Sequence, residues 1–318
     1  MTERDPERDE SVREAVERSR HGAPAVGAVV RDRFETHEVF HRIIVAADEE
    51  ATTGTRELFF SALAAGFAIT VTFLLYASLT AATGGDPIAS ALLYPLGFVF
   101  IILGGYQLYT ENTLPPVVLA LERLVSVPRL LRIWGTVLIG NFVGGGLGAV
   151  VLASTGVFSP AAATAATEIA LKGVETPFWD LFFKACFAGL IVAGVVWLDY
   201  TSRDTISRLL VIYMAFLAIP FGDLFHVVVS FTEVIYLVLA GEIGLVGPLV
   251  SFVFPVLLGN TVGGVLLVTV VNYFQTTEER LAMARADSTA EQLSTREWLF
   301  GQSYVPADTI EVGDRGDD

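Results

Sequence analysis

His226 is the one histidine within the long apolar part of this chain, and it closely follows an interruption at residues 220–223 (Pro-Phe-Gly-Asp). Ionisable side chains within apolar segments are energetically costly and commonly line a path for ions or protons. An imidazole titrates near neutral pH, so His226 could hold an anion as a cation or pass it a proton. The alternative is a neutral histidine that is hydrogen-bonded within a helix bundle.

A second polar group lies in the corresponding interruption of an earlier apolar segment. Residues 108–112 (Leu-Tyr-Thr-Glu-Asn) place the Thr110 hydroxyl beside the ring of Tyr109 and the carboxylate of Glu111. A lone threonine in a loop means little. Because this one lies in one of two matching interruptions, which must face protein or a water-filled path, it carries more weight.

Residues 37–41 (His-Glu-Val-Phe-His) match the HExxH pattern. On a helix, His37 and His41 would share a face and could hold zinc, with Glu38 as the general base. A catalytic zinc needs a third protein ligand and a shaped cleft, and no convincing third ligand stands out. We therefore expect a solvated helix face with no metal or other cofactor, and keep a zinc-dependent membrane enzyme as the less favoured alternative.

The elements that carry these residues have the composition of a membrane protein. Of 318 residues, 53% are hydrophobic and the mean hydropathy is +0.58, above the usual range for a soluble domain. Six apolar segments each approach the ~20 residues that cross ~30 Å of hydrocarbon. They lie at about 58–82, 89–121, 131–155, 179–199, 207–240 and 248–274. The second and fifth carry the interruptions, which predicts an all-α membrane protein with broken second and fifth helices.

A Gly-Asn-x-x-Gly-Gly pattern occurs at residues 140–145 and again at 259–264. The chain therefore looks like two copies of a three-helix unit, the second inverted because three spans is an odd number. Asn141 and Asn260 are expected to donate hydrogen bonds across helices, and direct contact with the solute is the alternative. Glycines spaced four apart give the third and sixth helices a small-residue face for close packing: Gly140, Gly144, Gly259 and Gly263.

Charge is segregated along the chain. Residues 57–276 carry 12 acidic and 7 basic side chains, whereas the two tails carry 23 acidic and 13 basic. We therefore expect a transmembrane transport domain at 57–276. It would lie between an acidic cytoplasmic tail with an amphipathic helix at 1–56 and a second acidic cytoplasmic tail at 277–318. The net charge of −15 indicates a strongly solvated surface and says little about the substrate.

Basic residues mark one side of the expected membrane domain. With the N-terminus inside, the cytoplasmic connections would hold seven arginines: Arg123, Arg129, Arg132, Arg203, Arg208, Arg280 and Arg285. The opposite connections hold mostly acidic residues: Asp86, Glu168, Lys172, Glu175 and Glu242. This positive-inside pattern predicts a multi-pass protein of the plasma membrane with both termini in the cytoplasm.

Over roughly residues 57–276 the chain resembles the formate/nitrite transporter family. Residues 107–112 and 222–226 resemble the loops in the family's broken second and fifth helices, and the Gly-Asn pattern matches its third and sixth helices. Its turn before the fifth helix resembles residues 203–204, and its approach to the fourth resembles Lys172 followed by residues 177–179. The resemblance implies an aquaporin-like fold, a pore in each subunit of a homopentamer, and transport of formate, nitrite or hydrosulfide, often with a proton.

The resemblance also implies roles for individual residues. Thr110 would gate the path and contact the solute together with Leu108, and His226 would exchange the proton. A bare anion is costly in an apolar constriction, whereas its neutral conjugate acid is not, so a proton-lending histidine between two constrictions makes physical sense. Tyr94 and Phe98 would line a cytoplasmic constriction, with Tyr109 nearby. Lys172 would attract anions on the outer side.

The chain departs from the family pattern in ways that bear on substrate. The family's asparagine in the fourth helix, a partner of the histidine, falls on Gly189, while Glu111, Asp223 and Glu233 add carboxylates. A carboxylate beside an anion path repels the anion unless it is protonated or paired; Glu111 could instead be bonded to N–H groups of its own loop. A channel for a small neutral solute or water therefore remains the alternative function. No nucleic-acid partner is expected.

Overall fold

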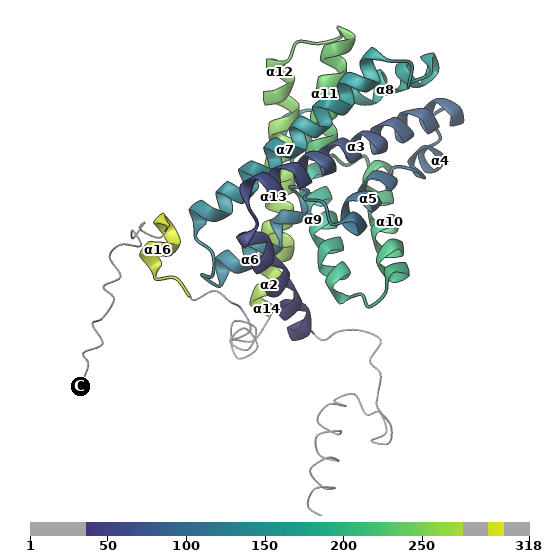
Figure 1. Ribbon diagram of the computed structural model, residues 1–318. Helices are drawn as coiled ribbons and strands as arrows, with labels where there is room; N and C mark the ends of the chain where they lie inside the picture. The colour runs from purple at the N-terminus through teal and green to yellow at the C-terminus, as the bar shows by residue number, and fades with distance from the viewer. Residues whose placement is uncertain (1–35, 276–291, 302–318) are drawn as a thin grey trace, which may run out of the picture. The chain divides into compact units, whose positions relative to one another are not determined.

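The computed structural model describes residues 36–275 and 292–301, and every regular element within these residues is helical (Figure 1). Five stretches are long and apolar enough to cross a membrane: Thr55–Thr83, Pro87–Gly104, Val127–Ser154, Phe178–Thr201 and Val246–Gln275. Two further apolar helices are shorter, Thr205–Phe221 and Val227–Ala240. The expected class, an all-α membrane protein, is confirmed.

The elements follow one another without a strand in the described ranges. Those of the first half are α2 (Thr36–Thr52), α3 (Thr55–Thr83), α4 (Pro87–Ala91), α5 (Leu96–Gly104), η1 (Glu111–Thr113), α6 (Pro115–Leu121) and α7 (Val127–Ser154). Those that follow are α8 (Pro160–Glu175), α9 (Phe178–Thr201), α10 (Thr205–Phe221), α11 (Val227–Ala240), α12 (Val246–Pro248), η2 (Leu249–Val253), α13 (Phe254–Gly264), η3 (Val265–Val270), α14 (Val271–Gln275) and α16 (Thr295–Phe300).

The helices differ from the sequence-based expectation in two places. The third apolar helix, α7, begins at Val127 rather than near 131, because the Ser126 hydroxyl accepts a hydrogen bond from the N–H of Arg129 and caps it. Helix α8 was not expected at all. Its sequence is rich in alanine and threonine and too short to span, but Ser159 caps it and Pro160 occupies its first position.

The second and fifth apolar segments are each divided between two helices. Helix α5 ends at Gly104, and Gly105 follows with a φ of 68°, a backbone conformation that favours glycine. Helix α6 then begins with Pro115 and Pro116. In the later segment, α10 ends at Phe221 and α11 begins at Val227. Both divisions leave helix-terminal N–H and C=O groups that need partners elsewhere.

The glycines of the repeated pattern lie at two close helix crossings. A Cβ at Gly140 would lie 2.6 Å from Cβ of Ala62, and Gly148 faces Thr70, so α3 and α7 run parallel along each other. In the second half, a Cβ at Gly259 would lie 2.6 Å from Cβ of Ala185, which joins α13 to α9. Small residues allow each pair of backbones to approach closely.

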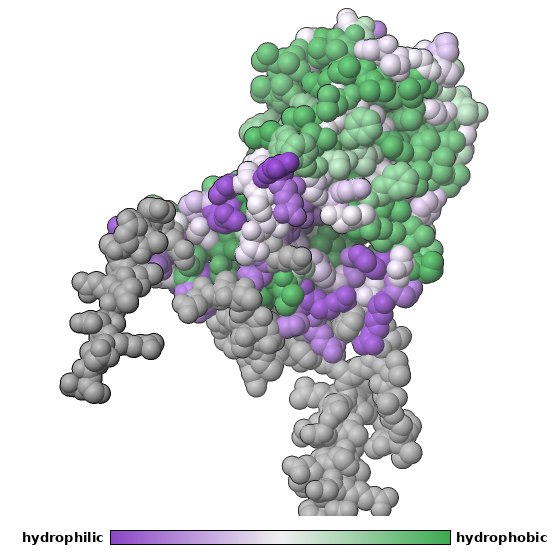
Figure 2. Space-filling model, viewed as in Figure 1, coloured by the Kyte–Doolittle hydropathy of each residue, from purple (hydrophilic) through white to green (hydrophobic). Residues whose placement is uncertain are grey.

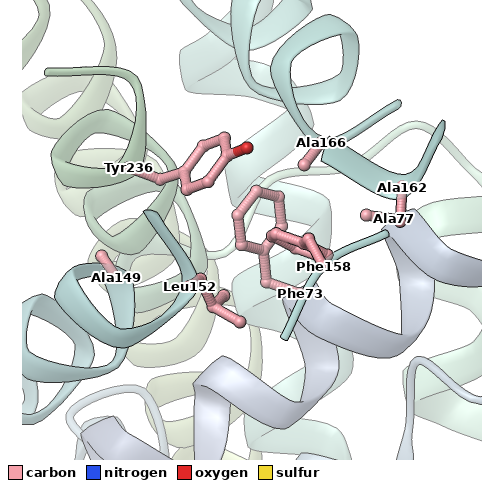
Figure 3. Packing of buried hydrophobic residues seen from close by; sticks show 8 residues of the cluster. All are labelled: Phe73, Ala77, Ala149, Leu152, Phe158, Ala162, Ala166 and Tyr236. Atoms are coloured by element: carbon pink, nitrogen blue, oxygen red, sulfur yellow. The ribbon is translucent and has the colours of Figure 1, made fainter. Parts of the chain in front are cut away.

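A buried cluster joins the far ends of α3 and α7 to α8 and α11 (Figure 3). The Phe73 ring packs edge-on against Phe158 and Tyr236, with ring centroids 6.0 and 5.5 Å apart. Alanines fill the space around the three rings, as the close-up shows. Edge-to-face aromatic contacts of this kind add about 0.5–1.5 kcal/mol each beyond the burial of their area, so α8 is anchored although it is too short to span.

Large hydrophobic side chains remain exposed along the long helices. Figure 2 shows that hydrophobic residues cover most of the part of this face where Figure 1 places α3, α8, α11 and α12. Exposed aromatic residues include Phe60, Phe67, Phe100, Phe183 and Phe187, which are 46–61% exposed. Apolar area on this scale marks a surface for lipid or for another subunit.

Helix α2 packs through one apolar face onto the rest of the bundle. Val39, Phe40 and Ile43 are at most 1% exposed, and Phe40 meets Trp197 of α9 edge-on at 5.2 Å. The Arg42 guanidinium donates a 2.6 Å hydrogen bond to the carbonyl of Tyr200, at the end of α9. The sequence-based domain limits are not tested by these contacts, and residues 1–35, Arg280 and Arg285 lie outside the described residues.

Candidate functional site

Two side chains from the two divided segments meet inside the bundle. Thr110 Oγ1 and His226 Nε2 lie 2.8 Å apart, a hydrogen-bond distance, and both residues are 1% exposed. Thr110 directly precedes η1, and His226 directly precedes the first turn of α11. Nδ1 of His226 is buried and has no hydrogen-bond partner among the described residues. The imidazole thus has one ring nitrogen engaged and one available.

Aromatic rings stack over one side of this pair. Phe98 of α5 lies flat on Phe216 of α10, with ring centroids 3.9 Å apart and an interplanar angle of 16°. The same Phe98 meets the His226 ring edge-on at 5.0 Å. Tyr94 stacks on Phe98 at 5.7 Å and contacts Tyr76 of α3 at 5.6 Å. A column of apolar rings therefore extends from His226 towards the far end of α3.

Tyr109 lies on the other side of the pair. Its ring packs against Trp134, near the start of α7, and its hydroxyl lies 2.9 Å from Oγ1 of Thr261. Tyr94 contacts the last third of α3, and α3 and α7 are parallel, so Tyr94 and Tyr109 lie on opposite sides of His226. Tyr109 was expected near the constriction of Tyr94 and Phe98, but between Tyr94 and Tyr109 the chain turns at Gly105.

The names start side and finish side are used below for the ends of the bundle where α3 begins and ends. Helix α9 ends on the start side, because Arg42 of α2, just before α3, bonds the carbonyl of Tyr200. Helix α11 runs towards the finish side, since Phe231 stacks on Phe142 at 4.0 Å and Tyr236 reaches the cluster around Phe73. Tyr109 thus faces the start side, and Tyr94 the finish side.

Asn141 ties the first division to its neighbouring helices. Its amide donates to the carbonyls of Ala62 and Gln107 at 2.8 and 2.9 Å, and its Oδ1 accepts from the N–H of Tyr109 at 2.8 Å. The side chain is fully buried. Hydrogen bonds to the backbone on either side of Leu108 hold the loop in place, and Leu108 itself is fully buried.

Asn260 does the same for the second division. Its amide donates to the carbonyls of Ala185 and Phe225 at 2.9 and 3.0 Å, and its Oδ1 accepts from the N–H of Val227 at 2.9 Å. His226 lies between the two bonded backbone positions. The geometry therefore gives both asparagines a backbone-holding position, and their contact with Thr110 or His226 is indirect.

Two lysines converge on one carboxylate beside the second division. Lys172 Nζ lies 2.6 Å from Oδ1 of Asp223, and Lys184 Nζ lies 2.5 Å from Oδ2. Both lysines line a pocket of about 580 Å³ together with Glu168, Glu175 and Asp180. The side chain of Lys172 is 62% exposed, so solvent screens its ion pair. The two lysines and Asp223 sum to one net positive charge, beside the three carboxylates that line the same pocket.

Glu111 follows Thr110 in sequence but does not share its hydrogen bond to His226. Its Oε1 is buried without a hydrogen-bond partner among the described residues, so bonding by the loop's own N–H groups is not observed for that atom. The loop is instead held by Asn112, whose amide donates to the Gln107 side chain at 2.8 Å, and by Trp134, whose indole donates to the carbonyl of Asn112.

Gly189 has a different role from the one implied by the resemblance. A Cβ at Gly189 would overlap the backbone carbonyl of Asn260, just as a Cβ at Gly66 would overlap that of Asn141. The position is a close helix crossing, repeated in both halves. A side chain at this position would require the two backbones to move apart, so the glycine is explained by packing.

The HExxH pattern lies on α2, and the structure lends no support to a zinc site. Glu38 and His41 have interaction partners of their own. Among the residues whose placement is described, no three histidine, cysteine, aspartate or glutamate side chains converge to hold a metal. A pair of histidines without a third ligand does not make a catalytic zinc site.

Several contacting residues were not expected from the sequence. Phe216 completes the stack on Phe98, and Trp134 and Thr261 hold Tyr109 and its loop. No sequence pattern distinguishes these three from lipid-facing neighbours. Lys184 did carry a signal, because the chain has only two lysines and the other, Lys172, had been singled out.

The fold and this buried polar site define an α-helical transport protein of the membrane. The chain belongs to the formate/nitrite transporter family, whose model matches residues 37–274. It is 28% identical over 233 residues to the inner membrane protein YfdC of Escherichia coli, covering 72% of this chain and 74% of that protein. It is 25% identical to the formate channel FocA of Haemophilus influenzae over 49% of this chain and 57% of that protein.

Solved structures share the fold. An FNT family ion channel superposes with a TM-score of 0.70 at 20% identity, covering 76% of this chain and 99% of that one. A pentameric formate channel with formate bound gives a TM-score of 0.60 at 20% identity, covering 70% of this chain and 97% of that one. The matching family is one of transporters, and FocA and the two solved structures are channels, so the zinc-enzyme alternative has no support.

Proposed function

We propose that this protein carries a small monovalent anion of the formate, nitrite or hydrosulfide class across the membrane together with a proton. One observation carries the proposal: the Thr110 hydroxyl and the His226 imidazole meet at 2.8 Å where the two divided segments converge. An anion that displaces the Thr110 contact finds a hydroxyl donor and a proton source in one place. The family and the formate channels among its relatives support this class of solute.

The aromatic rings on either side of Thr110 and His226 explain why the anion needs a proton. Phe98 and Tyr94 narrow the finish side, and Tyr109 narrows the start side. A charged ion would lose its hydration at either constriction, whereas the neutral acid loses far less. Imidazolium gives its Nε2 proton to the anion, the neutral acid crosses the next constriction, and the proton is released in water beyond it.

The wider architecture follows the repeated pattern. We assign two inverted three-helix repeats of aquaporin-like type with broken second and fifth helices: α3, α4–α6 and α7, then α9, α10–α11 and α12–α14. The parallel crossings of α3 with α7 and of α9 with α13 support the repeat. The transport domain would span residues 57–276 between cytoplasmic tails at 1–56 and 277–318. The start side then faces the cytoplasm, the exposed apolar helices face lipid and four other copies in a pentamer, and the membrane is the plasma membrane.

Uptake into proteoliposomes tests the proposal. Vesicles containing the protein are offered formate, nitrite, hydrosulfide and glycerol, with and without an inward proton gradient. We expect the weak acids to enter faster than in empty vesicles, the gradient to accelerate them, and glycerol to stay outside. Fast glycerol or water entry that ignores the gradient would favour the alternative, a channel for small neutral solutes.

A further inference from the structure

Glu233 is a carboxyl group buried in α11 that the anion path does not require. The residue is 6% exposed, and no hydrogen bond or ion pair to it is formed within the described part of the chain. A carboxyl group at this depth is costly unless it has a task or a partner. The groups around Glu233 indicate a functional role.

Glu233 shares a helix face with His226. Positions 226, 230 and 233 are separated by four and three residues, so Ser230 lies between the other two along one face. Nδ1 of His226 and Oγ of Ser230 are both buried without a hydrogen-bond partner in the described ranges. Two unengaged polar atoms thus lead from the imidazole towards Glu233.

Helix α3 adds polar atoms opposite this face. Oγ1 of Thr72 is fully buried and also lacks a partner among the described side chains, and it faces Gly97 beside Phe98. The hydroxyls of Tyr76 and Tyr94 are within electrostatic reach of the Glu233 carboxylate. Buried polar atoms that lack protein partners are the usual sites of ordered water. Water molecules that bridge from Glu233 to His226 would occupy these unpartnered positions of α11 and α3.

No basic side chain neutralises Glu233 from the helices packed around it. The facing parts of α7, η2 and α13 carry no acidic or basic residue. Helix α8 carries Glu168, Lys172 and Glu175, which line the outer pocket, and Asp223 there is paired with Lys172 and Lys184. Tyr76, Tyr94 and Tyr236 are the other titratable groups on this side, and Tyr236 bonds the carbonyl of Ala163.

We propose that Glu233 is a second proton-binding group, which loads His226 from the finish side. The proposal rests on the proposed proton-linked transport. Seven residues of helix rise by about 10 Å, too far for direct transfer, so Ser230 and water must bridge the gap. The Glu233 carboxyl gives up its proton and becomes a carboxylate, Nδ1 of His226 gains one, and the imidazolium gives its Nε2 proton to the anion. The ring is then left with its proton on Nδ1, and movement of that proton to Nε2, through water or by a ring flip, restores the starting tautomer before the next cycle. Water on the finish side reprotonates Glu233.

The relay is tested by measuring proton and formate fluxes in the same vesicles. Full-length wild type, Glu233→Gln, Ser230→Ala and Glu242→Gln are reconstituted, the last being an exposed glutamate just beyond α11. An internal pH dye reports net formate-coupled proton uptake, and labelled formate reports exchange at equal pH. We expect Glu233→Gln to slow net uptake about tenfold or more and Ser230→Ala to slow it less, with exchange retained within about twofold. Glu242→Gln should match wild type.

An infrared measurement gives a readout that does not depend on flux. Formate binding to wild type should change a carboxylic-acid carbonyl band, and that band should be absent from Glu233→Gln. Equal net uptake by Glu233→Gln and Glu242→Gln, or a band that survives the substitution, would overturn the relay while leaving anion transport intact. A wild-type protein that moves formate without protons would instead overturn the proposed function, and the relay with it.

Discussion

Asn141 and Asn260 make the same three hydrogen bonds in the two halves of the chain. Each amide donates to a carbonyl of the helix it crosses and to a carbonyl of the adjacent division, and each Oδ1 accepts an N–H just beyond it. The bonded backbone flanks Leu108 in one half and His226 in the other. The positions of Leu108 and His226 are therefore set by two buried amides.

Replacing Asn260 by alanine should destabilise the protein because three buried backbone groups lose their partner. Each unsatisfied buried group costs about 1–3 kcal/mol, so we expect a loss of at least about 3 kcal/mol and a melting temperature lower by roughly 6–12 °C. Thermal unfolding of the purified protein in detergent measures this. Thr164→Ala, which removes an exposed hydrogen bond to the carbonyl of Pro160 in its own helix at 3.2 Å, is the control. Equal melting of the two variants would contradict the account.

Installing asparagine at Gly189 should disrupt packing, although the family resemblance places an asparagine there. A Cβ at this position overlaps the carbonyl of Asn260, whereas a Cβ at Gly194, in the same helix, meets nothing within 4 Å. We expect Gly189→Asn to be destabilised by about 3 kcal/mol or more and Gly194→Asn to melt near wild type. A stable Gly189→Asn protein with faster transport would show that the position does serve His226.

The sequence predicted the class of fold and the candidate residues better than their arrangement. Periodic apolar segments and the repeated Gly-Asn pattern depend on short-range features that can be read directly. The stack of Phe98 on Phe216 and the separation of Tyr94 from Tyr109 depend on how the chain turns at Gly105, a long-range outcome. Helix α8 escaped prediction because its alanines and threonines are weakly apolar, and the cluster around Phe73 stabilises it only in the folded bundle.

Asp223→Asn should strengthen anion attraction at the pocket lined by Lys172 and Lys184. The substitution frees the charges of Lys172 and Lys184 and leaves their number unchanged. Asparagine also tolerates the φ of 55° at this position, so the turn should survive. We expect the apparent KM for formate to fall about twofold to fivefold at 0.01 M salt, where the Debye length is about 30 Å. The difference should vanish near 1 M salt. A decrease in KM that persists at high salt would argue for a direct contact instead.

Glu50 should make the packing of α2 sensitive to pH. Its Oε1 is buried, and burial raises the pKa of this carboxyl from 4.5 to about 8. When α2 is detached from the bundle, Glu50 is exposed and loses its proton at a lower pH than in the folded protein. The stability of α2 packing therefore falls as the pH rises from about 4.5, and the loss is complete above about 8. We expect Glu50→Gln to gain melting temperature over wild type steadily between about pH 5 and pH 8. The exposed Glu57→Gln should show no such trend; a constant difference for Glu50→Gln would refute the assignment.

The central claim is that His226 lends the proton that lets an anion cross as a neutral acid. Formate uptake into proteoliposomes, measured with and without an inward proton gradient, tests it most directly in wild type and His226→Phe. The account predicts that the gradient accelerates wild-type uptake about tenfold or more and that the phenylalanine variant loses this acceleration. Uptake that responds equally to the gradient in both proteins would contradict the account.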